Sequence, residues 1–250
     1  MGESCEDMAK QWQIRREDQD LLAYESHQKA AAAYARGFYS DLVMPLRGLD
    51  KDNILRPDTT LEKLATLKPA FDKRSGNGTL TAGNSTNLSD GASAALLSSE
   101  AWAQANGKEI QAYLVDAQVA AVDFVAGEGL LMAPAWAVAQ LLKRNNLKLQ
   151  DFDFYEIHEA FAAQVLCTLK AWESEEFCKT KLGMDGALGS IDRSKLNVVG
   201  SSLALGHPFA ATGARIVATA AKLLKEKGQG RVLISICTAG GMGVAAIVER

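Results

Sequence analysis

The chain has 250 residues, of which 48% are hydrophobic and 23% are charged, a composition typical of a globular protein with a large apolar core. Its 30 acidic and 27 basic side chains give a net charge of −3 without a long block of one sign, which argues against a nucleic-acid-binding protein. No apolar run approaches the roughly 18 residues of a membrane span, and residues 1–10 lack the pattern of a secretory signal.

The first part of the chain is expected to be helical and then irregular. The pattern of apolar residues predicts a helix over 17–36. Residues 41–75 contain three prolines among scattered charges, so we expect a long surface segment there. Ser89 or Asp90 is then expected to cap an alanine-rich helix that runs to about Ala105.

From residue 109 onward the pattern alternates between strand and helix. Such alternation predicts an α/β fold with a mixed sheet. The helices are expected over 133–143, 159–172 and 210–227. The strands are expected over 110–122, 152–157, 198–205, 231–237 and 244–248.

The cysteines give no sign of a disulfide framework or a metal site. All four are far apart in the chain and none forms a CxxC pair, so a reducing cytoplasm is the expected location. The string His158-Glu159-Ala160-Phe161-Ala162 comes nearest to a metal motif, but Ala162 stands where a zinc-protease helix needs a second histidine. We therefore expect no metal. The four are Cys5, Cys167, Cys178 and Cys237.

Three reactive side chains fall where an apolar run meets a helix or a glycine loop, namely His158, His207 and Cys237. Ligands of open α/β sheets bind at the carboxyl ends of strands, where all three are expected. Each also has a structural interpretation, since a lone histidine there is more often hydrogen-bonded and a lone cysteine is usually a small buried hydrophobe. The glycines of 240–243 can simply form a hairpin turn, and no Walker or dinucleotide motif is present. The coincidence of the three favours a functional site.

Acyl transfer is the chemistry that this trio can support. A histidine at a helix N-terminus is disfavoured as imidazolium, and the neutral ring can act as a base or bind an oxyanion. A cysteine before a glycine loop can exchange protons beside backbone N–H groups that bind a developing oxyanion.

Four stretches, in order and spacing, resemble the C-terminal part of a thiolase. The HEAF string, where many thiolases have Asn-Glu-Ala-Phe, is similar to the trifunctional-enzyme β-subunit type of acetyl-CoA acyltransferase. The stretches are 76–91 (GNGTLTAGNSTNLSDG), 158–161 (HEAF), 205–213 (LGHPFAATG) and 237–243 (CTAGGMG).

The resemblance implies a thiolase-like mixed β-sheet with helices on both faces, preceded by a helical and irregular remnant of a loop domain. Its implied boundaries are 1–75 for that remnant, 76–107 for the end of the N-terminal thiolase domain and 108–250 for the C-terminal thiolase domain. The implied activity is cleavage of a 3-ketoacyl-CoA by CoA, or condensation of acyl-CoAs in reverse, as in fatty-acid β-oxidation. Coenzyme A and acyl-CoA are substrates, and no permanently bound cofactor is expected.

The resemblance also implies roles for six residues. His207 matches the histidine that activates the nucleophilic cysteine, Cys237 the general acid/base, and His158 the side chain of an oxyanion hole. Binding roles fall to the N–H of Ala239 at a second oxyanion site, to Thr86 at the pantetheine arm and to Arg56 along the CoA nucleotide, although Arg56 can equally be a solvated loop charge.

The chain departs from the family pattern at three places. Ala239 replaces a glycine, which a backbone donor tolerates, and Asn87 replaces a glycine beside the pantetheine, which narrows the tunnel. Thiolases carry their nucleophilic cysteine in the N-terminal half, and Cys5, on an expected surface helix, is no replacement. We therefore expect the C-terminal portion of a longer or split enzyme.

The partners that follow are an N-terminal thiolase half, a second copy of the chain or a hydratase–dehydrogenase α-subunit. The alternative is a non-catalytic subunit that binds acyl-CoA or serves assembly. A condensing enzyme of the same superfamily fits less well, because such enzymes do not keep a late cysteine before paired glycines.

Overall fold

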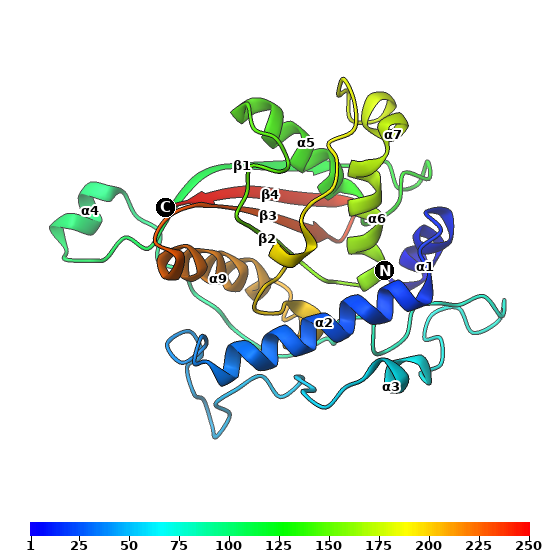
Figure 1. Cartoon of the computed structure of the whole chain (residues 1–250), viewed down its shortest axis with the longest axis horizontal. Coiled ribbons are helices and arrows are strands. Elements are labelled where there is room, and N and C mark those ends of the chain that lie inside the picture. Colours follow the sequence, from blue (N-terminus) through cyan, green and yellow to red (C-terminus); the bar gives the residue numbers. More distant parts are fainter.

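The computed structural model describes all residues from Met1 to Arg250. Its C-terminal half is built around a four-stranded sheet in the order β1-β4-β3-β2 (Figure 1). Strand β4 runs antiparallel to both β1 and β3, whereas β2 and β3 are parallel, which confirms the predicted mixed sheet. The strands are β1 (Tyr113–Ala121), β2 (Phe154–Ile157), β3 (Arg231–Thr238) and β4 (Met242–Glu249).

Helices cover both faces of this sheet because side chains alternate along the strands. Leu233 and Cys237 of β3 belong to the core formed with α5 and α6, whereas Val232 and Ile234 pack with α9 on the opposite face. Figure 1 shows α5 and α9 on opposite sides of the sheet. The long helices of this half are α5 (Ala133–Asn145), α6 (Ala162–Glu173) and α9 (Ala211–Lys227).

The N-terminal part packs helices against the end of the sheet layer. The long helix α2 contacts α3, α6 and α8, and α1 contacts α6. The predicted helix and the irregular segment after it are both found, apart from one short helix inside that segment. The N-terminal helices are α1 (Gly2–Gln11), α2 (Arg16–Ala35) and α3 (Leu61–Ala65).

The predicted helix from Ser89 to Ala105 is wrong over most of its length. Residues 91–99 form neither helix nor strand, and only α4 (Glu100–Ala105) is helical, capped by the Ser99 hydroxyl. Helices of this length are stabilised by packing an apolar face, and here Leu96 and Leu97 are 73% and 66% exposed. Alanine content alone therefore does not produce a helix, and α4 protrudes from the body of the molecule (Figure 1).

The predicted strand over 198–205 is also wrong. The segment instead ends in a single helical turn, α8 (Ser202–Leu205), in which the N–H groups of Ala204 and Leu205 donate to the Ser201 carbonyl. Gly200 has a φ of +78°, which an extended strand does not accommodate. His207 therefore follows a helical turn rather than a strand. The remaining elements are α7 (Glu175–Thr180) and the 3₁₀ helix over Arg193–Lys195.

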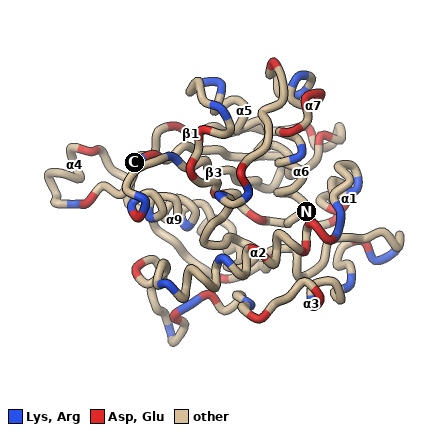
Figure 2. The backbone as a smooth tube through the Cα atoms, viewed as in Figure 1, with Lys and Arg blue, Asp and Glu red and all other residues tan.

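Charges of both signs are interspersed along the backbone rather than gathered on one element (Figure 2). None of the helices combines the length and the apolar character that crossing a lipid bilayer requires.

Candidate active site

The structure brings His158 and His207 together from segments 49 positions apart in the chain (207 − 158 = 49). Their ring centroids are 4.4 Å apart. His158 directly follows β2, and its N–H donates to the Ser235 carbonyl of β3 over 2.9 Å. The end of β2 and the turn after α8 thus meet at one point, and both histidines line it.

Gly206 sets the position of His207. It has a φ of +85°, and a Cβ atom there would lie 2.5 Å from Ser89 Oγ and 2.7 Å from Ile54 Cδ1. The two side-chain ends could move aside, but the positive φ itself requires glycine. The N–H of His207 then donates to the Asn87 carbonyl over 3.1 Å. This hydrogen bond joins the histidine to the loop that contains Asn87.

The ring of His207 is held through its Nδ1 atom, which lies 2.7 Å from Thr212 Oγ1 in the first turn of α9. Burial lowers the pKa of His207, and the nearby positive charge of Arg215 lowers it further. The ring is therefore neutral at pH 7.

His158 is more deeply buried than His207. Its Nδ1 atom lies 2.7 Å from Ser202 Oγ, while its Nε2 atom is buried and has no hydrogen-bond partner in the chain. Burial lowers the pKa of His158 well below its ordinary value, and the positive charge of Arg215 acts in the same direction. A neutral ring with a free Nε2 can bind an oxygen atom of a ligand.

Cys237 lies near the end of β3, two residues beyond the one that binds the His158 N–H. Its thiol belongs to the core cluster that also contains Ala160 and Phe161, and no hydrogen bond joins it to either histidine. Burial raises the pKa of the Cys237 thiol to about 12, so the thiol is protonated at neutral pH. A buried, protonated thiol can donate a proton, as a general acid does.

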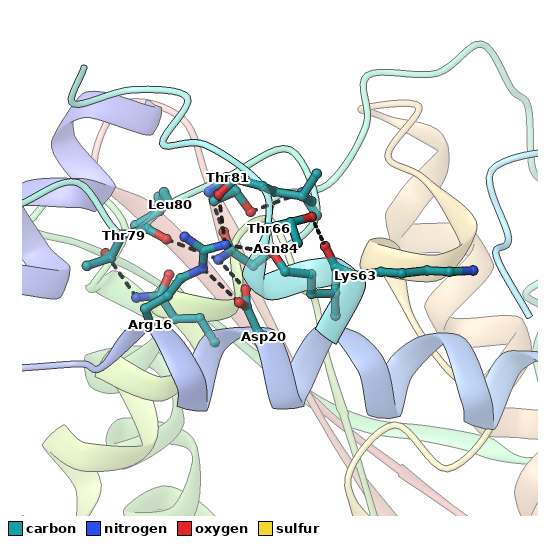
Figure 3. Close-up of polar contacts among 12 residues, drawn as sticks. Arg16, Asp20, Lys63, Thr66, Thr79, Leu80, Thr81 and Asn84 are labelled. Carbon is teal, nitrogen blue, oxygen red and sulfur yellow. Dashed lines mark hydrogen bonds and ion pairs between the residues drawn. The ribbon is translucent and has the colours of Figure 1, made fainter. Parts of the chain in front are cut away.

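The loop with Thr86 connects the site to α2. Thr86 Oγ1 donates to the Ser202 carbonyl over 2.6 Å, and its N–H donates to the Ala160 carbonyl over 3.0 Å. Figure 3 shows the polar network that anchors the preceding residues, in which Asn84 Nδ2 donates to Asp20 Oδ1 of α2 over 2.9 Å. Asp20 also accepts from Arg16 Nε over 2.8 Å. Thr86 is therefore fixed beside the two histidine segments.

The other two candidate residues lie at the surface. Ala239 is exposed in the turn between β3 and β4, and its N–H donates to no other residue of the chain. The Arg56 guanidinium donates to the carbonyls of Asn53 and Leu55 in its own loop, and its backbone N–H donates to His27 Nδ1. No hydrogen bond joins Arg56 to His158 or His207.

Both parts of the chain match known family models. Residues 1–101 match the thiolase N-terminal domain, and residues 108–250 match the thiolase C-terminal domain. The chain belongs to the thiolase family.

Known thiolases align with the whole of this chain, but the chain spans only 58% of the length of the curated relatives it matches. The chain is 46% identical over 255 aligned residues to a 3-ketoacyl-CoA thiolase of Shewanella baltica (strain OS155 / ATCC BAA-1091), covering 100% of the chain and 58% of that protein. The corresponding protein of Shewanella loihica is 45% identical with the same coverage. The crystal structure of the Bacillus anthracis acetyl-CoA acetyltransferase superposes with a TM-score of 0.82 at 38% identity, covering 100% of this chain and 59% of that one.

Cys5 of this thiolase chain is placed differently from the expectation. It lies on α1, but it is fully buried in the main core rather than on a surface helix. Burial raises the pKa of the Cys5 thiol well above its ordinary value, and the negative charge of Glu6 acts in the same direction. A thiol that stays protonated is a poor nucleophile, which agrees with the exclusion of Cys5 as the acyl carrier.

The buried residue that joins the thiolase segments was not predicted from the sequence. Glu159 accepts hydrogen bonds from Ser26 Oγ of α2 over 2.7 Å, from Asn197 Nδ2 over 2.7 Å and from the Leu203 N–H over 3.1 Å. Ser202 and Arg215 were missed as well. The signal available for Glu159 was its charge inside an otherwise apolar HEAF string, since a buried carboxylate needs several donors.

The raised pKa of Glu156 predicts that the stability difference between the wild type and Glu156→Gln depends on pH. Burial raises the pKa of Glu156 from 4.5 to about 8, although the charge of Arg215 opposes this. The folded protein therefore keeps a proton up to about pH 8 that the unfolded chain releases near 4.5, so the carboxyl destabilises the fold increasingly between these values. Relative to the wild type, Glu156→Gln should gain up to ~1.4 kcal/mol in free energy of unfolding per pH unit over this window.

Urea unfolding at pH 5, 6.5 and 8 measures this difference. The same substitution at the exposed Glu176 serves as the control and should show no such increase. A Glu156→Gln advantage that is constant with pH would mean that Glu156 is ionised in the folded protein.

Proposed function

We propose that this chain supplies the acid–base and oxyanion groups of a thiolase that acts on 3-ketoacyl-CoA. The observation that carries the proposal is the contact between His158 and His207, two neutral imidazoles with centroids 4.4 Å apart, beside the strand that bears the protonated Cys237 thiol. Relatives named 3-ketoacyl-CoA thiolase support the substrate class. The HEAF string supports the trifunctional-enzyme β-subunit type.

Each group has a defined task in thiolysis. His207 takes the proton of the nucleophilic cysteine, which attacks C3 of the substrate, and His158 donates to the thioester oxygen of the leaving fragment. The C2–C3 bond breaks, and C2 receives the thiol proton of Cys237 as the shortened thioester leaves. The Cys237 thiolate then removes the proton of free CoA, whose sulfur takes the acyl group from the nucleophilic cysteine. The cysteine leaves as a thiolate and takes back the proton held by His207, which restores every group to its starting state.

Substrate binding involves the segments around this site. Thr86 is proposed to bind the pantetheine arm, the free N–H of Ala239 the second oxyanion, and Arg56, whose guanidinium lies in an exposed loop, the CoA nucleotide. Coenzyme A acts as a substrate, with no permanently bound cofactor. The proposed domains are a loop-domain remnant at 1–75, the end of the N-terminal domain at 76–107 and the C-terminal domain at 108–250.

A partner is proposed to cover the exposed apolar residues that lie between the loop beside His207 and the protruding helix α4. Leu88, Leu96 and Leu97 are 74%, 73% and 66% exposed, and apolar groups of this kind drive association. The occupants proposed are an N-terminal thiolase half with the nucleophilic cysteine, a second copy of the chain or a hydratase–dehydrogenase α-subunit. The proposed setting is fatty-acid β-oxidation in the cytoplasm.

Intact mass spectrometry of the natively purified protein, before and after addition of a 3-ketoacyl-CoA, tests the function. We expect an acyl adduct on a cysteine outside these 250 residues, on a longer chain or on a co-purified partner, together with release of a shortened acyl-CoA when CoA is added. An adduct on Cys237 would require different roles. CoA binding without an adduct or turnover would indicate the non-catalytic subunit instead.

A further inference from the structure

Three side chains from three separate segments form a hydrogen-bonded chain behind the candidate site. Arg215 Nη2 on α9 donates to Ser202 Oγ on α8 over 2.8 Å. Ser202 Oγ in turn lies 2.7 Å from Nδ1 of His158, which follows β2. The hydrogen-bonded chain therefore runs from Arg215 through Ser202 to Nδ1 of His158. The other ring nitrogen of His158, Nε2, has no partner.

The chemistry of these groups fixes the direction of one hydrogen bond and favours one direction for the other. A guanidinium has only donors, so Ser202 Oγ must accept from Arg215. Ser202 Oγ has no partners other than Arg215 and His158, so its single hydrogen finds an acceptor in the chain only when it is directed to His158 Nδ1. In that arrangement Nδ1 of the neutral ring is the acceptor, and the ring proton is on Nε2.

We propose that Arg215 is a positioning residue that acts through Ser202 to hold His158 as the Nε2–H tautomer. The purpose assigned to this tautomer rests on the proposed function: it directs a donor at the thioester oxygen where negative charge develops. The other tautomer would present a lone pair to that oxygen. Burial keeps His158 neutral, so its tautomer decides whether it attracts or repels an oxyanion.

The cost of keeping Arg215 supports a role beyond packing. Its Nε and Nη1 atoms are buried without partners, and the donation to Ser202 is the only hydrogen bond of the guanidinium in the chain. Buried polar atoms without partners are rare in proteins because they destabilise the fold. The charge of Arg215 also acts on the buried Glu156, whose pKa it lowers, but the one group that accepts a hydrogen bond from the guanidinium is Ser202 Oγ. An effect of Arg215 on the tautomer of His158 therefore passes through Ser202.

Nitrogen-15 NMR of the histidine rings tests the proposal without any assay of turnover. The chain has three histidines, His27, His158 and His207, whose ring signals are assigned by single substitution. In the wild type at pH 7 we expect His158 to have a pyrrole-type Nε2 and a pyridine-type Nδ1. In Ser202→Ala the ratio of Nε2–H to Nδ1–H tautomers should fall about tenfold.

Ser201→Ala is the matched control. Ser201 is equally buried and adjacent, but its hydroxyl donates to the Ile157 carbonyl and not to His158. This variant should keep the wild-type tautomer ratio. A wild-type His158 protonated at Nδ1, or equal effects of the two serine substitutions, would overturn the proposal.

Two substitutions isolate the contribution of Arg215. Lysine also has only donors, so Arg215→Lys should retain the tautomer, whereas Arg215→Met should lower the ratio about threefold. An unchanged tautomer ratio in Arg215→Met would show that Arg215 does not help to hold the tautomer of His158. The tautomer ratio can change as expected in these variants while the native protein has no thiolase turnover. In that case the proposed function is wrong, but the role of Arg215 and Ser202 in holding the His158 tautomer is confirmed.

Discussion

Replacing Cys237 with alanine is expected to lower kcat for thiolysis of a 3-ketoacyl-CoA by about 10²–10⁴-fold, the usual contribution of a general acid/base. The thiol is buried and protonated, and alanine can neither donate its proton to C2 nor take one from CoA. The affinity for CoA should not change, because the Cys237 thiol transfers a proton and contributes little to the contacts that bind CoA. Steady-state kinetics and calorimetric CoA binding, both with the natively assembled protein, measure the two quantities.

Cys167→Ala is the control for loss of a buried thiol. Cys167 is also fully buried, and burial raises its pKa to about 12 as well, but its thiol lies against the Met8 carbonyl of α1. This variant should retain kcat while losing a similar amount of stability. Equal losses of turnover in the two variants would show that Cys237 has only a packing role.

Replacing Glu159 with glutamine is expected to lower the free energy of unfolding by about 3 kcal/mol or more. Both carboxylate oxygens accept hydrogen bonds, from Asn197 on one side and from Ser26 and Leu203 on the other. An amide offers one oxygen, so its NH₂ group must face a donor in either orientation. Urea denaturation at pH 7 measures the loss.

Glu156→Gln is the matched control for this substitution, because Glu156 is equally buried but has no hydrogen-bond partner on either oxygen. It should leave the stability at pH 7 unchanged or raise it. Similar destabilisation by both variants would mean that burial of the side chain, rather than its hydrogen bonds, explains the effect at Glu159.

Long periodic elements were predictable from the sequence. The helix α9 was expected within one or two residues because its apolar residues follow the 3.6-residue period of a helix. The hairpin of β3 and β4 was expected equally closely because its strands are near-continuous apolar runs on either side of a glycine turn, as in a sheet covered on both faces. The thiolase resemblance also placed His158 and His207 in one site, and the structure brings their rings into contact.

Features that depend on non-local packing were not predictable. Residues 91–99 are rich in alanine and leucine, yet all of them are exposed, so no apolar face is buried to stabilise a helix. The apolar run before His207 fits a strand as well as a helical turn, and Gly200 decides between them. Ser202 and Arg215 meet only because α9 packs beside α8, a contact that no local pattern encodes.

The alternation along β3 restricts how this hairpin can change during evolution. Odd-numbered positions from Leu233 to Cys237 face one helix layer, and the even-numbered positions between them face α9. Inserting or deleting one residue before Cys237 would turn its thiol to the wrong side of the sheet and bring an aliphatic side chain into its place. Insertions or deletions in β3 are therefore tolerated only when they involve an even number of residues. The turn after Cys237 can change length by an odd number, because such a change does not alter which face the thiol points to.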